Sequence, residues 1–246
     1  MTHLPAILSR TLPLVVAMLV GGCDLPGRPK PADRPVSPRD ITDFALLFQR
    51  NCSGCHGADG EFGPAPPLND PLFLAIVPDE EVLRTVREGR RGTPMPGFAP
   101  QVGGPLTDEQ VRILATGIKL HRQTPDSLTV AGIPSPAYIG AVGSAERGRT
   151  MFAKACEGCH GEQGRGGPRA GAVHDPALLS LISDRALRRI IITGRSDLGM
   201  PGFGDDDGRS HDFQPLTSTD IDDLVALLAG WRKEIGVNPS PVPRSN

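Results

Sequence analysis

The chain has 246 residues, and its 26 Lys and Arg against 28 Asp and Glu give a formal net charge of −2 at pH 7. With no basic run or basic excess, it lacks the electrostatic footprint of a nucleic-acid-binding protein, so we expect no nucleic-acid partner. The 30 glycines, 26 prolines and only 4% aromatic residues predict compact, loop-rich domains whose small cores are completed by something other than side chains.

Residues 1–22 have the features of an export signal peptide. A short segment ending at Arg10 precedes the apolar stretch Thr11–Val20, about half the roughly 20 residues that a membrane-spanning helix needs. No A-x-A cleavage site follows. The string Val20-Gly21-Gly22-Cys23 instead resembles a bacterial lipobox. We therefore expect cleavage before Cys23 and lipidation of its thiol, with ordinary secretion as the alternative.

Residues 23–39 are the predicted lipid-anchored tether. After Cys23 they hold five prolines and almost no apolar side chain, so they cannot bury surface and favour an extended polyproline II conformation. At about 3.1 Å per residue, such a segment would hold a domain up to ~50 Å from a membrane. The protein is thus expected to be exported and anchored by lipid at the periplasmic face of a bacterial membrane.

Two copies of one pattern follow the tether, at residues 40–124 and 144–236. A linker, residues 125–143, separates the copies, and residues 237–246 form a C-terminal tail. Matching strings occur in the same order in both: Asn69-Asp70-Pro71-Leu72 with His174-Asp175-Pro176-Ala177, Met95-Pro96-Gly97-Phe98 with Met200-Pro201-Gly202-Phe203, and Pro105-Leu106-Thr107 with Pro215-Leu216-Thr217. The sequence therefore predicts two tandem domains of one fold.

Helix signals frame each copy. The sequence predicts helices over Asp79–Glu88 and Asp184–Thr193, each ending at a glycine. A capping box at Thr107–Gln110, and a weaker one at Thr217–Asp220, predict the start of each C-terminal helix. A further helix is expected before each cysteine pair, because a phenylalanine lies four residues ahead of the first cysteine. The expected fold class is all-α.

The cysteines carry the strongest chemical signal. Besides Cys23, they form two identical patterns, Cys52-Ser-Gly-Cys55-His56 and Cys156-Glu-Gly-Cys159-His160. CxxCH is the attachment sequence of c-type haem: two thiols on one helical turn reach the two vinyl groups, and the adjoining imidazole ligates the iron. The sequence predicts two covalently bound haem c groups with His56 and His160 as the first axial ligands.

Other uses of paired cysteines fit less well. A zinc ribbon would place its two CxxC pairs roughly 15–20 residues apart, whereas these pairs are about 100 residues apart. A thioredoxin-like redox pair would need a βαβ setting, and no strand pattern lies beside either pair. A disulfide in each pair remains as an alternative, but it leaves the following histidines unexplained.

With these motifs the chain resembles a tandem class I cytochrome c, similar to di-haem high-potential cytochromes and to the haem subunits of respiratory oxidases. The resemblance covers roughly three quarters of the chain and implies that the first and last helices of each domain cross near the haem. The family places a small residue at this crossing. Gly148 fills that position in the second copy, but Phe44 stands there in the first, so we expect a looser crossing in the first domain.

The resemblance also implies a methionine as sixth ligand in each copy. Met1 and Met18 leave with the signal peptide, and Met151 lies on the helix before its own CxxCH, where core filling is expected. Met95 and Met200 remain, each in a Met-Pro-Gly-Phe string like the ligand loop of the family. Rival ligands exist in the second copy: His174 and His211.

The resemblance also points to residues around the haems. In the family, a carbonyl of a proline region accepts the free N–H of the axial histidine, which points to Pro64 and Pro168. Arg90 and Arg195, five residues before each Met, match a haem propionate because a guanidinium binds a carboxylate through two hydrogen bonds. Ordinary solvated arginines are the alternative for both.

A thioether ligand favours Fe(II), and a six-coordinate iron leaves no position for a substrate. We therefore predict an electron-transfer protein with no catalytic residue, which is a carrier or a haem subunit of a larger complex in a respiratory chain. Its expected donor is a quinol-oxidising complex or a dehydrogenase, and its acceptor a terminal oxidase or reductase. The alternatives are a di-haem cytochrome c peroxidase, which needs one open iron, and a haem-based sensor, for which no output domain is present.

Overall fold

A computed structural model describes residues 35–120, 128, 130–137, 142–206, 211–234 and 236. The predicted signal peptide, Cys23 and the tail 237–246 lie outside the described residues, as do most of the tether and part of the linker. The chain divides into two compact units, Met1–Asp40 and Ile41–Asn246. The described part of the first unit contains a 3-10 helix, η2 (Pro38–Asp40).

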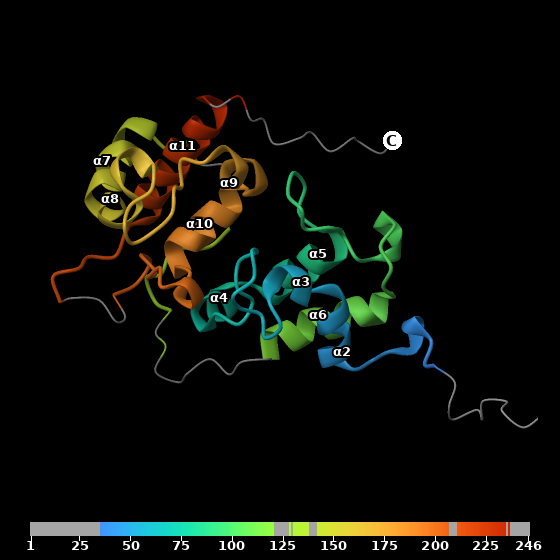
Figure 1. Cartoon of the computed structure of the whole chain (residues 1–246). Coiled ribbons are helices and arrows are strands. Elements are labelled where there is room, and N and C mark those ends of the chain that lie inside the picture. Colours follow the sequence, from blue (N-terminus) through green and yellow to red (C-terminus); the bar gives the residue numbers. More distant parts are fainter. Residues whose placement is uncertain are drawn as a thin grey trace, which may run out of the picture. The chain divides into compact units, whose positions relative to one another are not determined.

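The second unit is built from two sets of helices (Figure 1). Apart from one isolated bridge between Arg195 and Met200, its described residues form no β structure, which confirms the all-α fold class. The first set is α2 (Phe44–Asn51), α3 (Ser53–His56), α4 (Pro71–Ile76), α5 (Asp79–Glu88), η3 (Pro100–Val102) and α6 (Asp108–Leu120). The second set is α7 (Ala145–Ala155), α8 (Glu157–His160), η4 (Glu162–Gly164), α9 (Pro176–Leu181), α10 (Asp184–Thr193), η5 (Ser196–Leu198) and α11 (Ser218–Glu234).

The local start and stop signals work as expected. Helices α5 and α10 have the predicted bounds, and each ends at a glycine with positive φ. The capping box of α6 is reciprocal: the Thr107 N–H donates to Gln110 Oε1 over 3.0 Å, and the Gln110 N–H donates to Thr107 Oγ1 over 3.2 Å. Thr217 and Asp220 repeat this exchange at the start of α11. Short-range sequence therefore determines these boundaries.

Each set of helices encloses its own hydrophobic core. In the first domain, Phe48 of α2 packs with Val111 and Leu114 of α6, which are fully buried. In the second domain, Phe152 of α7 meets the ring of Trp231 edge-on, with 5.2 Å between ring centroids. These cores confirm two tandem domains, although the predicted boundaries at 40–124 and 144–236 stay predictions.

The crossing of the first and last helices is solved differently in the two domains. A Cβ on Gly148 would clash with the Asp223 carbonyl oxygen and lie 3.1 Å from the Leu227 Cβ, so α7 and α11 meet backbone to backbone. In the first domain the small residue is on the other helix, because the ring of Phe44 lies on Gly117. The small residue of the crossing is therefore on the first helix in the second domain and on the last helix in the first domain. The missing side chain of Gly117 therefore leaves room for the ring of Phe44, and the sequence of the first copy did not indicate this pairing.

Alanine at the two crossing glycines tests this arrangement. We expect Gly148→Ala to destabilise the protein by roughly 1–3 kcal/mol, because the new methyl group meets a backbone carbonyl that cannot rotate away. Gly117→Ala should cost less, since a phenylalanine ring can shift. Urea unfolding of the haem-loaded protein measures both effects.

Gly230→Ala is the matched control. Gly230 also lies in α11, but a Cβ there would meet nothing within 4 Å. Alanine at this position should leave stability unchanged or raise it by about 0.5–1 kcal/mol. Wild-type stability of Gly148→Ala would contradict the close crossing.

A basic residue of each last helix holds the turn between the two middle helices. Lys119 Nζ donates to the carbonyl oxygens of Leu74 and Val77 over 2.5 and 2.7 Å, and it pairs with Asp79. In the second domain Arg232 binds the matching carbonyls and carboxylate, which belong to Leu179, Ile182 and Asp184. These carbonyls lie at the ends of short helices and need donors. Sequence reasoning missed this clamp, because Lys119 and Arg232 occupy different positions in the repeat.

Candidate functional site

Both CxxCH sequences fold into one turn of helix directly after the first helix of their domain. The Cys52 N–H donates to the Phe48 carbonyl over 2.8 Å, and the His56 N–H donates to the Cys52 carbonyl over 2.9 Å. Cys156 and His160 repeat this arrangement with the same two lengths. Cysteine and histidine are thus one turn apart in both domains.

All four cysteines of the motifs are free thiols, so the disulfide alternative is not what the structure contains. Burial raises the pKa of Cys52 to about 11 and that of Cys156 to about 12, and the second cysteine of each pair adds to the shift. These two thiols stay protonated at neutral pH, which disfavours disulfide exchange.

The axial histidine candidates are each held by a backbone carbonyl. His56 Nδ1 donates to the Pro66 carbonyl over 2.8 Å, and His160 Nδ1 donates to the Gly171 carbonyl over 2.9 Å. With Nδ1 engaged as a donor, the lone pair of Nε2 is available for a metal. Burial lowers the pKa of His56 to about 4 despite the bond to Pro66, so this imidazole is neutral at pH 7.

The predicted acceptors, Pro64 and Pro168, are therefore wrong. In the first domain the Ala65 N–H donates to the Cys55 carbonyl, so the loop passes the motif at residue 65 and the carbonyl of residue 66 reaches the histidine. In the second domain a bond from the Gly167 N–H to the Ala170 carbonyl adds a turn to the loop. These hydrogen bonds lie within irregular loops, where counting residues does not locate a carbonyl.

The two methionine loops are folded alike. Met95 and Met200 are partly buried and pack against the cores of their domains. The Arg90 N–H donates to the Met95 carbonyl over 3.0 Å, and the Arg195 N–H donates to the Met200 carbonyl over 2.9 Å. A side chain on Gly89, which ends α5, would lie 2.7 Å from the Met95 oxygen. Gly89, and Gly194 in the second domain, thus allow the backbone of the methionine loop to pass close to the end of the middle helix.

The rival ligands of the second domain are engaged elsewhere. His174 stacks on Trp231 with 4.5 Å between ring centroids and 5° between planes. His211 is 92% exposed and pairs with Asp212 over 2.7 Å. Met200 is therefore the better-placed candidate.

The two arginines near the methionines differ. Both oxygens of Asp197 bind the Arg195 guanidinium, over 2.9 and 2.8 Å, and Arg195 also donates to the Gly63 carbonyl of the first domain. The propionate role of Arg195 stays a prediction, and the sequence spacing did not show these partners. The Arg90 side chain, in contrast, is partly buried and its guanidinium has no hydrogen bond to another described residue; burial lowers its pKa.

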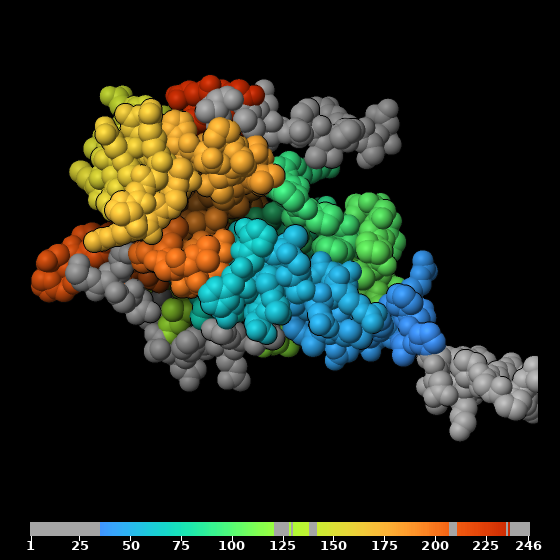
Figure 2. All heavy atoms as spheres, viewed as in Figure 1, coloured from blue at the N-terminus to red at the C-terminus, as the bar shows by residue number. Residues whose placement is uncertain are grey.

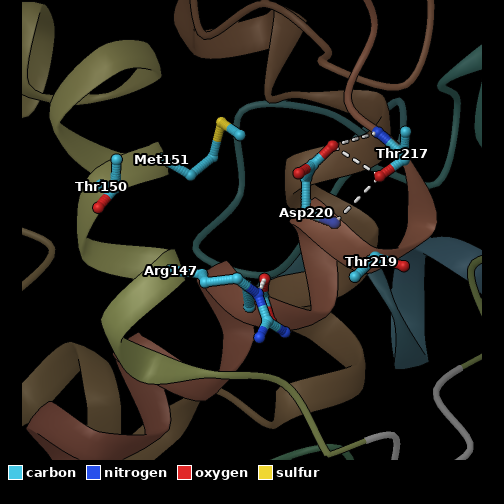
Figure 3. A pocket seen from close by; sticks show the side chains of 7 residues that line it. Arg147, Thr150, Met151, Thr217, Thr219 and Asp220 are labelled. Atoms are coloured by element: carbon cyan, nitrogen blue, oxygen red, sulfur yellow. Dashed lines mark hydrogen bonds and ion pairs between the residues drawn. The ribbon is translucent and has the colours of Figure 1, made fainter.

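A hollow between α7 and α11 lies apart from these residues (Figure 3). Arg147, Thr150 and Met151 line it from α7, opposite Thr217, Thr219 and Asp220 at the start of α11. No histidine or cysteine lines it. We therefore assign it no role in holding a cofactor.

The residues of the motifs fit haem c. Each domain combines two unpaired thiols on one turn with an imidazole whose Nε2 is left for a metal. In the first domain, the buried Asn69 Nδ2 has no hydrogen-bond partner among the described residues, so it could donate to a bound group. The fold and the site together define a di-haem c-type cytochrome with tandem class I domains.

Comparison with known proteins gives the family. The family model described as "Cytochrome C oxidase, cbb3-type, subunit III" matches residues 39–116 and 143–226, about two thirds of the chain. The chain belongs to this family. The match does not support the alternative of a di-haem peroxidase.

Curated relatives bear names from the same group. The cbb3-type cytochrome c oxidase subunit FixP of Sinorhizobium medicae is 32% identical over 141 residues, which cover 54% of this chain and 43% of FixP. The subunit CcoP of Azospirillum sp. is 28% identical over 156 residues, covering 58% of this chain and 48% of CcoP. The chain thus spans less than half the length of these relatives. No helix in the described part of the chain is long and apolar enough to cross a membrane.

Proposed function

We propose that this protein transfers single electrons through two haems at the periplasmic face of a bacterial membrane, as a carrier or as a haem subunit of a terminal oxidase complex. One observation carries the proposal. Both domains present the same set, a CxxCH turn with a carbonyl-bound histidine and a methionine loop held by the residue five positions earlier. A duplicated, complete set suits a relay of electrons better than one reactive centre.

We assign the residues of each set as follows. The thiols of Cys52 and Cys55, and of Cys156 and Cys159, hold the haems covalently. Nε2 of His56 and of His160 would supply a nitrogen ligand to the iron, and the thioethers of Met95 and Met200 would supply a sulfur ligand. Bound haem iron supplies the one-electron couple, and the protein binds and orients it and tunes its potential.

Backbone contacts prepare both axial positions. The carbonyls of Pro66 and Gly171 fix the ring orientation of the histidines and raise their basicity. Met95 and Met200 pack against the cores of their domains, which support the two methionine loops. The guanidinium of Arg90 and the side-chain amide of Asn69 would donate their N–H groups to an anionic edge of the first haem. An iron with six ligand positions filled favours electron transfer over bond chemistry.

The proposed location at the membrane depends on the amino-terminal segment of the chain. Lipid on Cys23 and the proline-rich tether would keep the domains near the membrane. The names of the relatives make a cbb3-type oxidase the first partner to test as the acceptor complex. A quinol-oxidising complex or a dehydrogenase is then the donor.

Detergent extraction followed by affinity purification tests this function. We expect the full-length protein in the membrane fraction, together with the core subunits of an oxidase or of a quinol-oxidising complex. A Cys23→Ser variant should move to the soluble periplasmic fraction with both haems, because it loses the anchor and no haem ligand. Recovery of the wild-type protein as a soluble species, without a redox partner, would contradict the proposal.

A further inference from the structure

The second domain contacts the loop that follows the first CxxCH motif. Asp197 Oδ2 accepts the Phe62 N–H over 2.9 Å, and Arg195 donates to the Gly63 carbonyl over 2.9 Å. Helix α10 adds two bonds: Arg189 donates to the Pro67 carbonyl, and Arg185 pairs with Glu81. Figure 2 shows the cyan segment of the first domain against the orange segment of the second. The residues around His56 are thus partly held by the other domain.

Arg189 is the central residue of this contact. It is only 4% exposed, and its guanidinium carbon lies 3.3 Å from the centroid of the Phe73 ring. Its hydrogen bond goes to a carbonyl, and no carboxylate among the described residues pairs with it directly. Burial, reinforced by Arg90, lowers its pKa to about 9, so it remains charged at pH 7. The interface contains a buried positive charge that no ion pair neutralises.

This charge is near the first axial histidine. Arg189 binds the carbonyl of Pro67, and the preceding carbonyl, that of Pro66, accepts the hydrogen bond of His56 Nδ1. The buried guanidinium and the axial histidine are therefore held by the carbonyls of two adjacent residues of one loop.

Arg189 has no buried counterpart at the same repeat position of the first domain. Arg84 is at that position, but its side chain is 48% exposed and pairs with Glu81 and Glu88 of its own helix. Arg84 therefore does not repeat the contact that Arg189 makes with the other domain.

We propose that Arg189 of the second domain raises the reduction potential of the first haem. Oxidation adds one positive charge at the iron, and a buried guanidinium beside the loop of the axial histidine disfavours that charge. Arg189 acts through the protein and is a positioning and electrostatic residue, not a ligand. The inference rests on the proposed ligation of the first haem by His56.

Spectroelectrochemical titration of the full-length, di-haem protein tests this inference. We expect Arg189→Gln to lower the ratio of Fe(II) to Fe(III) at the first haem about tenfold at fixed potential, a shift of about 59 mV for one electron. A unit charge roughly 10 Å away, at an effective dielectric of about 20, has an effect of this order. The ratio of Fe(II) to Fe(III) at the second haem should change less than about twofold, because the guanidinium of Arg189 is bound to the histidine loop of the first site.

Two variants separate charge from packing. Arg189→Lys keeps the charge and should restore most of the potential, although it loses the stacked guanidinium. Arg188→Gln is the matched control: Arg188 is also buried in α10, but it pairs with Asp222 of its own domain over 2.6 Å. This control should lower the melting temperature without moving either potential. If Arg189→Gln does not fold, Arg189→Met keeps the apolar stem on Phe73 and serves the same test.

The outcomes are distinct. Met95→His identifies the wave of the first haem, because it changes only that iron's ligand. If Met95→His moves one wave but Arg189→Gln leaves it in place, the inference is overturned while the ligation stands. Equal shifts in Arg189→Lys and Arg189→Gln would also overturn it, because packing would then explain them. If Met95→His moves neither wave, the ligation proposed for the first haem fails.

Discussion

Met95→His is expected to lower the midpoint potential of the first haem by on the order of 100 mV or more, well within the span of about 0.8 V that axial ligands cover. A second imidazole donates more strongly than a thioether and stabilises Fe(III). The second haem should keep its potential, because Met200 is in a separate loop against a separate core. A redox titration followed by visible absorption measures both waves.

Met200→His should give the reciprocal result. Met151→Leu is the matched control, since Met151 packs against the core from α7 and a leucine of similar volume keeps that packing. Methionine-to-alanine variants add a second readout, because an open sixth position lets carbon monoxide bind the reduced haem. If the wild-type protein bound carbon monoxide readily, or if neither histidine variant moved a potential, the His/Met assignment would be wrong.

Removal of one cysteine pair is expected to remove one haem. In a protein with Cys52→Ala and Cys55→Ala, intact mass spectrometry should find a single covalent haem, because no thiol of the first motif remains to form a thioether. The same change at Cys156 and Cys159 should leave only the first haem. The pyridine haemochrome absorbance per chain should fall by half in each case.

Ser53→Ala is the control within the motif. Ser53 lies between the cysteines, and its hydroxyl donates to the Gln49 carbonyl at the protein surface. This variant should carry two haems. A double cysteine variant that still carried two covalent haems would exclude these thiols as the attachment points.

The contact between the domains changes how the tandem repeat is understood. The repeat suggests two equal modules joined by a linker. In the structure, Asp197 and Arg195, just before Met200, bind the loop just after the first CxxCH motif. The methionine loop of the second site thus lies against the histidine loop of the first.

Most of the fold, and the helical turn of each CxxCH motif, could be predicted from the sequence because they depend on neighbours within a few residues. The spacing in CxxCH places two thiols and an imidazole on one helical turn. Gly89 and Gly194 ended α5 and α10 where expected, and Thr107 with Gln110 began α6. In each case the atoms that decide the result are less than two helical turns apart.

Only the tertiary structure decided the rest. Pro66 and Gly171 replaced the predicted acceptors Pro64 and Pro168, because loop hydrogen bonds determine which carbonyl reaches the histidine. The space for Phe44 came from Gly117 on a distant helix, and one partner of Arg195, the Gly63 carbonyl, came from the other domain. Such contacts join atoms that are far apart in sequence, so residue spacing does not encode them, and they exist only once the chain has packed.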